Sequence, residues 1–251
     1  MGRKSFKPGT LHAPLPAVMA TVGTMDNANI ITVAWTGILS SDPARTYISV
    51  RPSRYSHKLL SENGEFVINL TTEALARATD YAGIYTGAKV DKFEKLGLTK
   101  VPSEAVATPT IAESPLALEC RVFEVLHFGT HDVFMADIVS VSCDDSILDE
   151  KGKICLERAG LMAYAHGEYF ALGKSIGRFG FSATRANKNN APTKSSAFVK
   201  SRDQKAEAVK PVSYKKAKTP HGKVDKKDVG KPENHKKRVT GAKKTKGNGA
   251  K

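Results

Sequence analysis

Residues 116–142 read LALECRVFEVLHFGTHDVFMADIVSVS, and this stretch decides the fold class. Two runs rich in β-branched and aromatic residues, Leu116–Phe128 and Val133–Ser142, flank a short connection. In the first run, apolar and charged side chains alternate along Leu118, Glu119, Cys120, Arg121 and Val122. A period of two residues is typical of a strand with one buried face. We therefore predict an antiparallel β-hairpin.

Strand-like runs also precede this hairpin. They span Ala17–Gly23, Asn29–Trp35, Thr46–Arg51 and Glu65–Leu70. The turn sets Asp26-Asn27 and Ser41-Asp42-Pro43 lie between them, as expected in an antiparallel sheet.

Helical patterns are few and short. They cover Tyr55–Asn63, Glu73–Tyr81 and Asp91–Leu96. The sequence has neither βαβ alternation nor a GxGxxG fingerprint, which argues against a doubly wound nucleotide fold. We predict a mainly β, α+β architecture, in which short helices lie between the strands of a barrel.

The basic character of the chain belongs to one end. The formal net charge of the 251 residues is +14, but residues 1–184 hold 18 Lys and Arg against 20 Asp and Glu. Residues 185–251 hold 21 against 5. So polar a segment cannot bury enough apolar area to offset an ordering entropy of about 1–2 kcal/mol per residue. We predict an N-terminal arm over 1–15, a barrel domain over 16–184 and a disordered Lys-rich tail over 185–251.

Cysteine usage and hydropathy indicate where the protein resides. Cys120, Cys143 and Cys155 are odd in number and form no CxxC pair, which argues against a disulfide framework and against a zinc site. Pro14 and Pro16 interrupt the apolar part of the N-terminus, where a signal peptide needs a continuous run. No run reaches the roughly 18 apolar residues of a membrane span. We expect a cytoplasmic protein with no bound metal and no membrane association.

The turn SVRPSRYSHK, residues 49–58, gathers hydrogen-bond donors where a strand passes into a helix. After Pro52 ends the strand, Ser53 or Ser56 can cap the helix and leave backbone N–H groups facing outward. Basic side chains surround that helix start: Arg51, Arg54, His57 and Lys58. Arginine can bind a phosphate through two parallel hydrogen bonds. The turn is either a phosphate site or a solvated basic loop.

Two other features allow a functional and a structural interpretation. Trp35, the only tryptophan, stands beside small residues that would let a flat ring approach the backbone, although a single tryptophan more often packs in a core. His131 and Asp132 can belong to a site, but turn residues are the simpler interpretation. The segment GEYFALGKS, residues 167–175, has five residues rather than four between its first glycine and Gly173, so it is not a P-loop.

Taken together, several ordered blocks resemble the flavin reductase-like family of flavoredoxin-type proteins with an FMN-binding split β-barrel. The resemblance extends from about Pro16 to Ser182 and rests on the order and spacing of the blocks. These are NIITVAWTGILSSDP, YISVRPSRYSHKLL, GEFVINL, VDKFEKLGL, ESPLALEC, GTHDVFMADI and HGEYFALGKSIGRFGFS.

The resemblance implies a set of FMN contacts. The ribityl phosphate would lie against Arg51, Ser53, Ser56, His57 and Lys58. The isoalloxazine would lie against Thr32, Val33, Ala34 and Trp35, with Ser49 and Val50 nearby. A segment that closes over the cofactor would contribute Lys89, Asp91, Lys92 and Phe93. The family also implies a homodimer with the flavin near its interface.

The function expected from this resemblance is an oxidoreductase in which hydride passes from NADH or NADPH to flavin. The flavin carries that chemistry, so no catalytic side chain is predicted. The alternative is a flavoredoxin-type electron-transfer or flavin-carrier protein that docks a redox partner and lacks NAD(P)H activity of its own.

The basic tail would bind nucleic acid through non-specific charge contacts, or would serve only as a solubilising extension.

Overall fold

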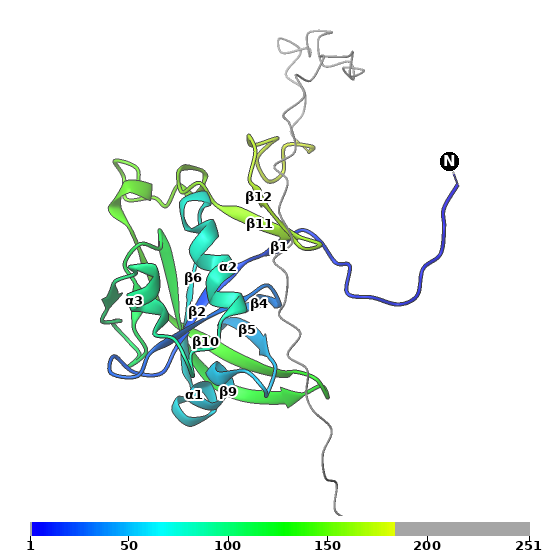
Figure 1. Ribbon diagram of the computed structural model, residues 1–251. Coiled ribbons are helices and arrows are strands. Elements are labelled where there is room, and N and C mark those ends of the chain that lie inside the picture. The colour runs from blue at the N-terminus through cyan, green and yellow to red at the C-terminus, as the bar shows by residue number, and fades with distance from the viewer. Residues whose placement is uncertain (1, 184–251) are drawn as a thin grey trace, which may run out of the picture. The chain divides into compact units, whose positions relative to one another are not determined.

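The fold is a mainly β split barrel with short helices, seen in a computed structural model that describes residues 2–183 (Figure 1). Seven strands form one sheet in the order β3-β2-β6-β9-β10-β5-β4, with antiparallel pairing throughout. Along the chain their bounds are β2 Val18–Val22, β3 Asn29–Val33, β4 Thr36–Ser41, β5 Ala44–Val50, β6 Glu65–Asn69, β9 Leu116–His127 and β10 Asp132–Cys143.

The predicted hairpin forms the middle of this sheet. β9 and β10 pair antiparallel from Leu116 opposite Cys143 to His127 opposite Asp132. The register shifts between Met135 and Ala136 and again between Ile138 and Ser140. Such bulges bend a strand and increase its twist. The hairpin joins β6 on one side to β5 on the other, so it connects the two halves of the barrel.

Two apolar clusters cover the two faces of the inner strands. The larger cluster lies inside the curled sheet and includes Val22, Ile48, Phe66 and Phe134, with Leu60 from helix α1 (Tyr55–Asn63). The second lies under helices α2 (Ala76–Ile84) and α3 (Lys92–Leu96) and contains Met19, Ile30, Leu75, Ala82, Phe93 and Ile111. Because β2 and β3 are buried on both sides, their position beneath the helices is fixed.

All three predicted helices are present, and α1 begins and ends at the predicted residues. The segment predicted at Glu73–Tyr81 begins as a 3-10 turn, η1 (Glu73–Leu75), capped by the Thr72 side chain, and continues as α2 to Ile84. Asp91 precedes α3 and accepts a hydrogen bond from the Glu94 amide, so it is the cap and not the first helical residue.

Several short elements were not predicted from the sequence. A second sheet, in the order β1-β11-β12, joins the N-terminal side of the domain to its end (Figure 1). The missed elements are β1 Leu15–Pro16, β4, β7 Lys100–Val101, β8 Thr110–Ile111, η2 Asp145–Ile147, η3 Leu156–Arg158, β11 Met162–Ala165 and β12 Glu168–Ala171. The start of GEYFALGKS is therefore a hairpin strand.

The two ends of the chain differ in what the structure describes. Residues 2–13 have no regular secondary structure and are exposed. The predicted tail, 185–251, lies outside the described residues. Within 2–183, no helix has the length and apolar character required to cross a membrane.

Candidate functional site

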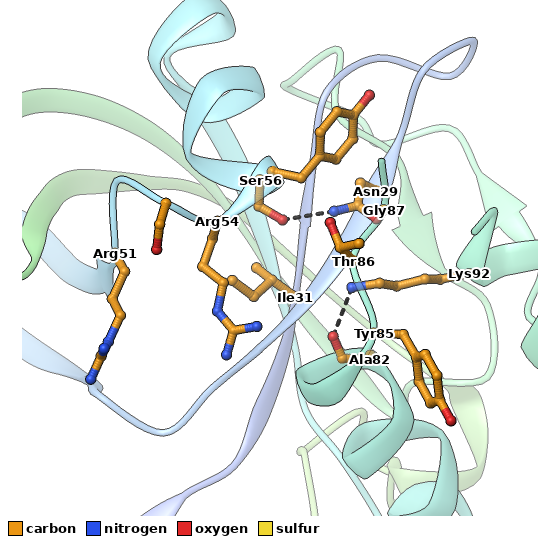
Figure 2. A pocket seen from close by; sticks show the side chains of 12 residues that line it. Asn29, Ile31, Arg51, Arg54, Ser56, Ala82, Tyr85, Thr86, Gly87 and Lys92 are labelled. Carbon is orange, nitrogen blue, oxygen red and sulfur yellow. Dashed lines mark hydrogen bonds between the residues drawn. The ribbon is translucent and has the colours of Figure 1, made fainter. Parts of the chain in front are cut away.

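The turn between β5 and α1 borders a cavity of about 400 Å³, here called the basic cavity (Figure 2). Its walls come from β3, the turn, α1, the end of α2 and α3. They are Asn29, Ile31, Arg51, Ser53, Arg54, Tyr55, Ser56, Ala82, Tyr85, Thr86, Gly87 and Lys92. Three cationic side chains line it, and none of the described residues in its wall is acidic. The cavity is therefore suited to an anion.

The start of α1 is built differently from the prediction. Arg54 occupies the N-cap position, and no side chain caps the helix, so the prediction that Ser53 or Ser56 does so is wrong. Ser56 lies inside the first turn, buried, and its hydroxyl accepts a 2.7 Å hydrogen bond from Asn29 Nδ2. A helix leaves its first N–H groups without intrahelical partners. Those of Tyr55 and Ser56 lie at the cavity wall, where an anion can accept from them.

Lys92 reaches the same cavity from the opposite wall. Its side chain is buried, and its ammonium donates to the carbonyl oxygen of Ile30 at 2.6 Å. It also donates to the carbonyl oxygen of Ala82 at 2.7 Å (Figure 2). An ammonium has three donors, which leaves a third for a ligand. Burial, followed by repulsion from Arg54, lowers the pKa of Lys92 from 10.5 to about 8. A bound anion would offset both effects.

A second cavity of about 340 Å³, here called the ring cavity, adjoins the first, because Ile31, Arg51 and Arg54 line both. Its wall is completed by Ala17, Thr32, Val33, Ala34, Trp35, Ser49, Val50, Asp80, Gly83, Ile84, His131, Tyr164 and Tyr169. The Ser49 amide donates to the Trp35 carbonyl oxygen at 2.9 Å. This bond holds the segment after β3 beside β5, so both predicted backbone stretches border one space.

Trp35 is a wall of this cavity and not a core residue. Its exposed fraction is 38%, and its ring centroid lies 4.4 Å from that of His131. The structural interpretation of Trp35 as core packing is therefore wrong. His131 stands directly before β10 and brings a second flat ring to the cavity, so the simpler interpretation of His131 as a turn residue is also incomplete. Burial, together with the charge of Arg51, lowers the pKa of His131.

Asp132 lines neither cavity but connects α1 to the start of β10. It is buried, and its carboxylate lies 2.7 Å from His57 Nε2 and 2.7 Å from His127 Nδ1. Hydrogen bonding from His127, and then from His57, lowers the pKa of Asp132 despite its burial. Since His57 belongs to α1 and His131 adjoins Asp132, this carboxylate fixes the helix start of one cavity relative to the rings of the other.

Asp132→Asn should lower the free energy of unfolding by about 1–3 kcal/mol at pH 7, because it removes charge-assisted bonds to two histidines. The pKa of Asp132 is lower in the folded protein, so its contribution is present above about pH 4 and is lost as the pH falls further. Urea unfolding at pH 7 and pH 3 measures this. The difference between the two proteins should shrink at pH 3, and an equal difference at both would contradict the role assigned to the carboxylate.

Gly87 lies where the chain passes close to Asn29. A Cβ there would come within 2.3 Å of Asn29 Oδ1 and 2.5 Å of its Cγ. Asn29 is buried and bonded to Ser56, so moving its side chain away from the added Cβ would break that hydrogen bond. Gly87→Ala should therefore destabilise the fold by about 1–3 kcal/mol, as measured by urea unfolding. The matched control is Gly173→Ala, where nothing lies within 4 Å of the added atom.

The structure brings ten of the fifteen predicted contact residues to the two cavities. These are Thr32, Val33, Ala34, Trp35, Ser49, Val50, Arg51, Ser53, Ser56 and Lys92. The other five lie elsewhere in the wall-forming elements and do not line either cavity: His57, Lys58, Lys89, Asp91 and Phe93. His57 faces Asp132, Lys58 pairs with Glu62 on the solvent side of α1, and Phe93 is core.

Several lining residues had no sequence signal strong enough to identify them. Asn29 reads as the first residue of a strand, and Asp80 and Gly83 read as part of an ordinary short helix. Tyr164 and Tyr169 belong to the missed β11–β12 hairpin. They pack edge to face, and the Tyr169 hydroxyl donates to Asp80 at 3.3 Å. Only the closure of the β1-β11-β12 sheet against the domain brings them to the ring cavity.

The contiguous cavities thus have one cationic end and one end walled by flat side chains. This arrangement suits an elongated ligand with a phosphate at one terminus and a planar ring system at the other. A sequence model of the flavin reductase like domain matches residues 11–173. The chain belongs to the flavin reductase-like family. A protein of Archaeoglobus fulgidus is 38% identical over 133 residues, which are 53% of this chain and 75% of that protein.

Solved structures of this family superpose on the described fold. The flavoredoxin of Desulfovibrio vulgaris (Miyazaki F) has a TM-score of 0.68 at 34% identity, covering 73% of this chain and all of that one. A flavoredoxin from Methanosarcina acetivorans has a TM-score of 0.66 at 26% identity, covering 72% of this chain and all of that one. The flavin reductase-like assignment therefore has support from sequence and from structure.

Proposed function

We propose that this protein binds FMN across the two cavities and acts as an oxidoreductase that accepts hydride from NADH or NADPH. The observation that carries the proposal is the continuity of the basic cavity with the ring cavity through Ile31, Arg51 and Arg54. The flavoredoxins and flavin reductases that share the fold support it as analogy. FMN has the matching shape, with a dianionic phosphate at one end and a planar isoalloxazine at the other.

Each end of the ligand would meet complementary groups. Arg51, Arg54 and Lys92 would hold the phosphate, together with the amides at the start of α1. The isoalloxazine would lie along Thr32–Trp35, beside Ser49 and Val50 of β5. The Thr32 hydroxyl donates to the Thr79 carbonyl oxygen of α2, which holds that strand segment under the helix. When bound, the flavin supplies hydride acceptance, and the protein supplies orientation and exclusion of water.

Purification provides the first test of this proposal. The protein should be yellow or should take up FMN stoichiometrically, with flavin released on denaturation. Oxidation of NADH or NADPH is then followed at 340 nm with FMN present. A protein that neither carries nor binds FMN contradicts the proposal. Tight FMN binding without pyridine-nucleotide oxidation would favour the second candidate, a flavoredoxin-type carrier that passes electrons to a partner protein.

The homodimer is also part of the proposal, and exposed apolar side chains on one half of the seven-stranded sheet support it. Strands β4, β9 and β10 expose Ile38, Leu39, Phe123, Leu126, Val139 and Val141. Patches of this kind mark protein interfaces. Sedimentation of the full chain should show a dimer at micromolar concentration, and Ile38→Asp, at a side chain that is 68% exposed, should shift it toward monomer. A monomeric wild-type protein contradicts this part.

We also propose that residues 185–251 bind nucleic acid through non-specific charge contacts. A segment with 21 basic and 5 acidic residues should bind RNA or DNA by counterion release, with affinity that falls as salt rises. A mobility-shift assay of the full chain and of a truncation after Ser182, at low and moderate salt, tests it. Equal binding by the two proteins would remove any role for the tail.

A further inference from the structure

A third cavity, of about 370 Å³, adjoins the ring cavity and is here called the arm cavity. Trp35 and Tyr164 line both spaces. The remaining wall comes from the N-terminal arm and from the turn of the β11–β12 hairpin: Thr10, Leu11, His12, Ala13, Leu15, His166 and Gly167. None of these residues belongs to the basic cavity, so the arm cavity is a separate space that meets the ring cavity at two aromatic side chains.

The small sheet holds the arm in place beside the hairpin. Leu15 of β1 pairs with Tyr164 of β11, and Pro16 pairs with Ala163. Tyr164 in turn lies opposite Tyr169 of β12. Figure 1 shows β1 alongside β11, with the arm leaving the domain at this point. The strand pairing therefore positions the arm residues directly before β1 at the mouth of the cavity.

The hairpin turn carries an unusual residue. His166 has a φ of +50° and is the one non-glycine residue with positive φ among those described, and Gly167 follows with a φ of +94°. Two successive positive φ values between paired strands are typical of a type I′ turn, which favours Asn-Gly. A histidine held in this conformation points to a use for its side chain, and that side chain lines the arm cavity.

The walls define the ligand that would fit. Trp35 and Tyr164 offer aromatic surfaces, and Leu11 and Leu15 add apolar contact. His12 and His166 are imidazoles that can donate hydrogen bonds to an anion, and no carboxylate lines the space among the described residues. We propose that the arm cavity binds a small planar aromatic molecule with one carboxylate, its ring against Trp35 and its carboxylate between His12 and His166.

The position of the arm cavity gives this binding a use. A molecule there touches Trp35 and Tyr164, the two side chains that also border the ring cavity, so it would lie next to the isoalloxazine. A bound aromatic carboxylate would therefore shield this side of the flavin from solvent, a role that rests on the proposed function. The binding of an aromatic carboxylate does not rest on it, because all of its contacts come from other residues or from the shared wall.

The test measures binding of benzoate to the full chain by titration calorimetry, with and without saturating FMN, and uses benzamide as the uncharged probe. Trp35 is the only tryptophan, so its fluorescence reports ligand binding at the shared wall. The variants are His166→Asn, which suits a left-handed turn, and His12→Gln. Each should weaken benzoate binding about 10- to 100-fold, as expected for one lost hydrogen bond to a charged group, and should leave benzamide and FMN binding unchanged.

The outcomes separate this inference from the proposed function. Saturable benzoate binding that persists with FMN bound and weakens in both variants supports the arm cavity as the site. The inference is overturned if benzoate shows no saturable binding at concentrations up to about 10 mM. Displacement of benzoate by FMN also overturns it, since the benzoate then occupies the ring cavity. Failure of FMN to bind, with benzoate binding intact, removes the proposed function and leaves the arm site standing.

Discussion

Arg54→Ala is expected to weaken FMN binding by about 10- to 100-fold, because a hydrogen bond from a guanidinium to a phosphate contributes about 1.5–3 kcal/mol. Arg54 lines both cavities and occupies the N-cap of α1, between the amides of the first turn and Arg51. Figure 2 shows its guanidinium among the side chains that line the basic cavity. Quenching of flavin fluorescence on titration measures the dissociation constant.

Two controls identify the phosphate as the group that Arg54 binds. Riboflavin lacks the phosphate, so its affinity should be nearly the same in the wild type and in Arg54→Ala. Lys58→Ala removes a cation from the same helix, but Lys58 faces solvent and pairs with Glu62 at 3.7 Å. Its loss should change FMN affinity less than about twofold, since exposed charges contribute little. Equal effects of the two variants would mean that only net charge attracts FMN.

The sheet could be predicted from the sequence where its pattern is local. The β9–β10 hairpin and α1 follow from alternation and from turn residues next to each other in the chain, and both appear where predicted. β4 carries a weaker signal, since Ile38 and Leu39 are neighbours and both are exposed, so it does not alternate. β11 and β12 have four residues each, and β1, which pairs with the other edge of β11, lies some 150 residues earlier in the chain. Pairing over such a distance leaves no local pattern.

The site residues, too, could be predicted only where the pattern is local in the sequence. The basic turn is contiguous in sequence, so its cations could be identified together, whereas the cap could not: Ser56 is held by Asn29, which is 27 positions away. His131 and Asp132 resemble turn residues in sequence, yet Asp132 is buried because His57 and His127 satisfy its carboxylate. A polar residue whose partners are distant cannot be distinguished from an exposed one before the fold is known.

FMN affinity is expected to fall as the pH rises through about 8, and Lys92 is the cause. In the free protein burial and Arg54 hold the pKa of Lys92 at about 8, whereas a phosphate dianion beside the ammonium raises it. Below pH 8 the ammonium is already charged, so binding needs no proton. Above pH 8 the protein must take one up, and affinity falls by up to tenfold per pH unit. The phosphate itself stays doubly charged over this range.

Titrations with FMN between pH 6.5 and 9.5 measure this fall, and two variants assign it. Lys92→Met should bind FMN more weakly at pH 7 and should show no change between pH 7 and pH 9. Arg54→Ala keeps the lysine but removes the charge that repels its ammonium, so the fall should move to higher pH. Without ligand, the stability of the fold should change in the opposite direction. The unfolded chain holds more protons than the folded protein between about pH 8 and 10.5, so the contribution of Lys92 to the free energy of unfolding rises with pH through that window. A wild-type affinity that is constant from pH 7 to 9 would mean that Lys92 does not face the phosphate.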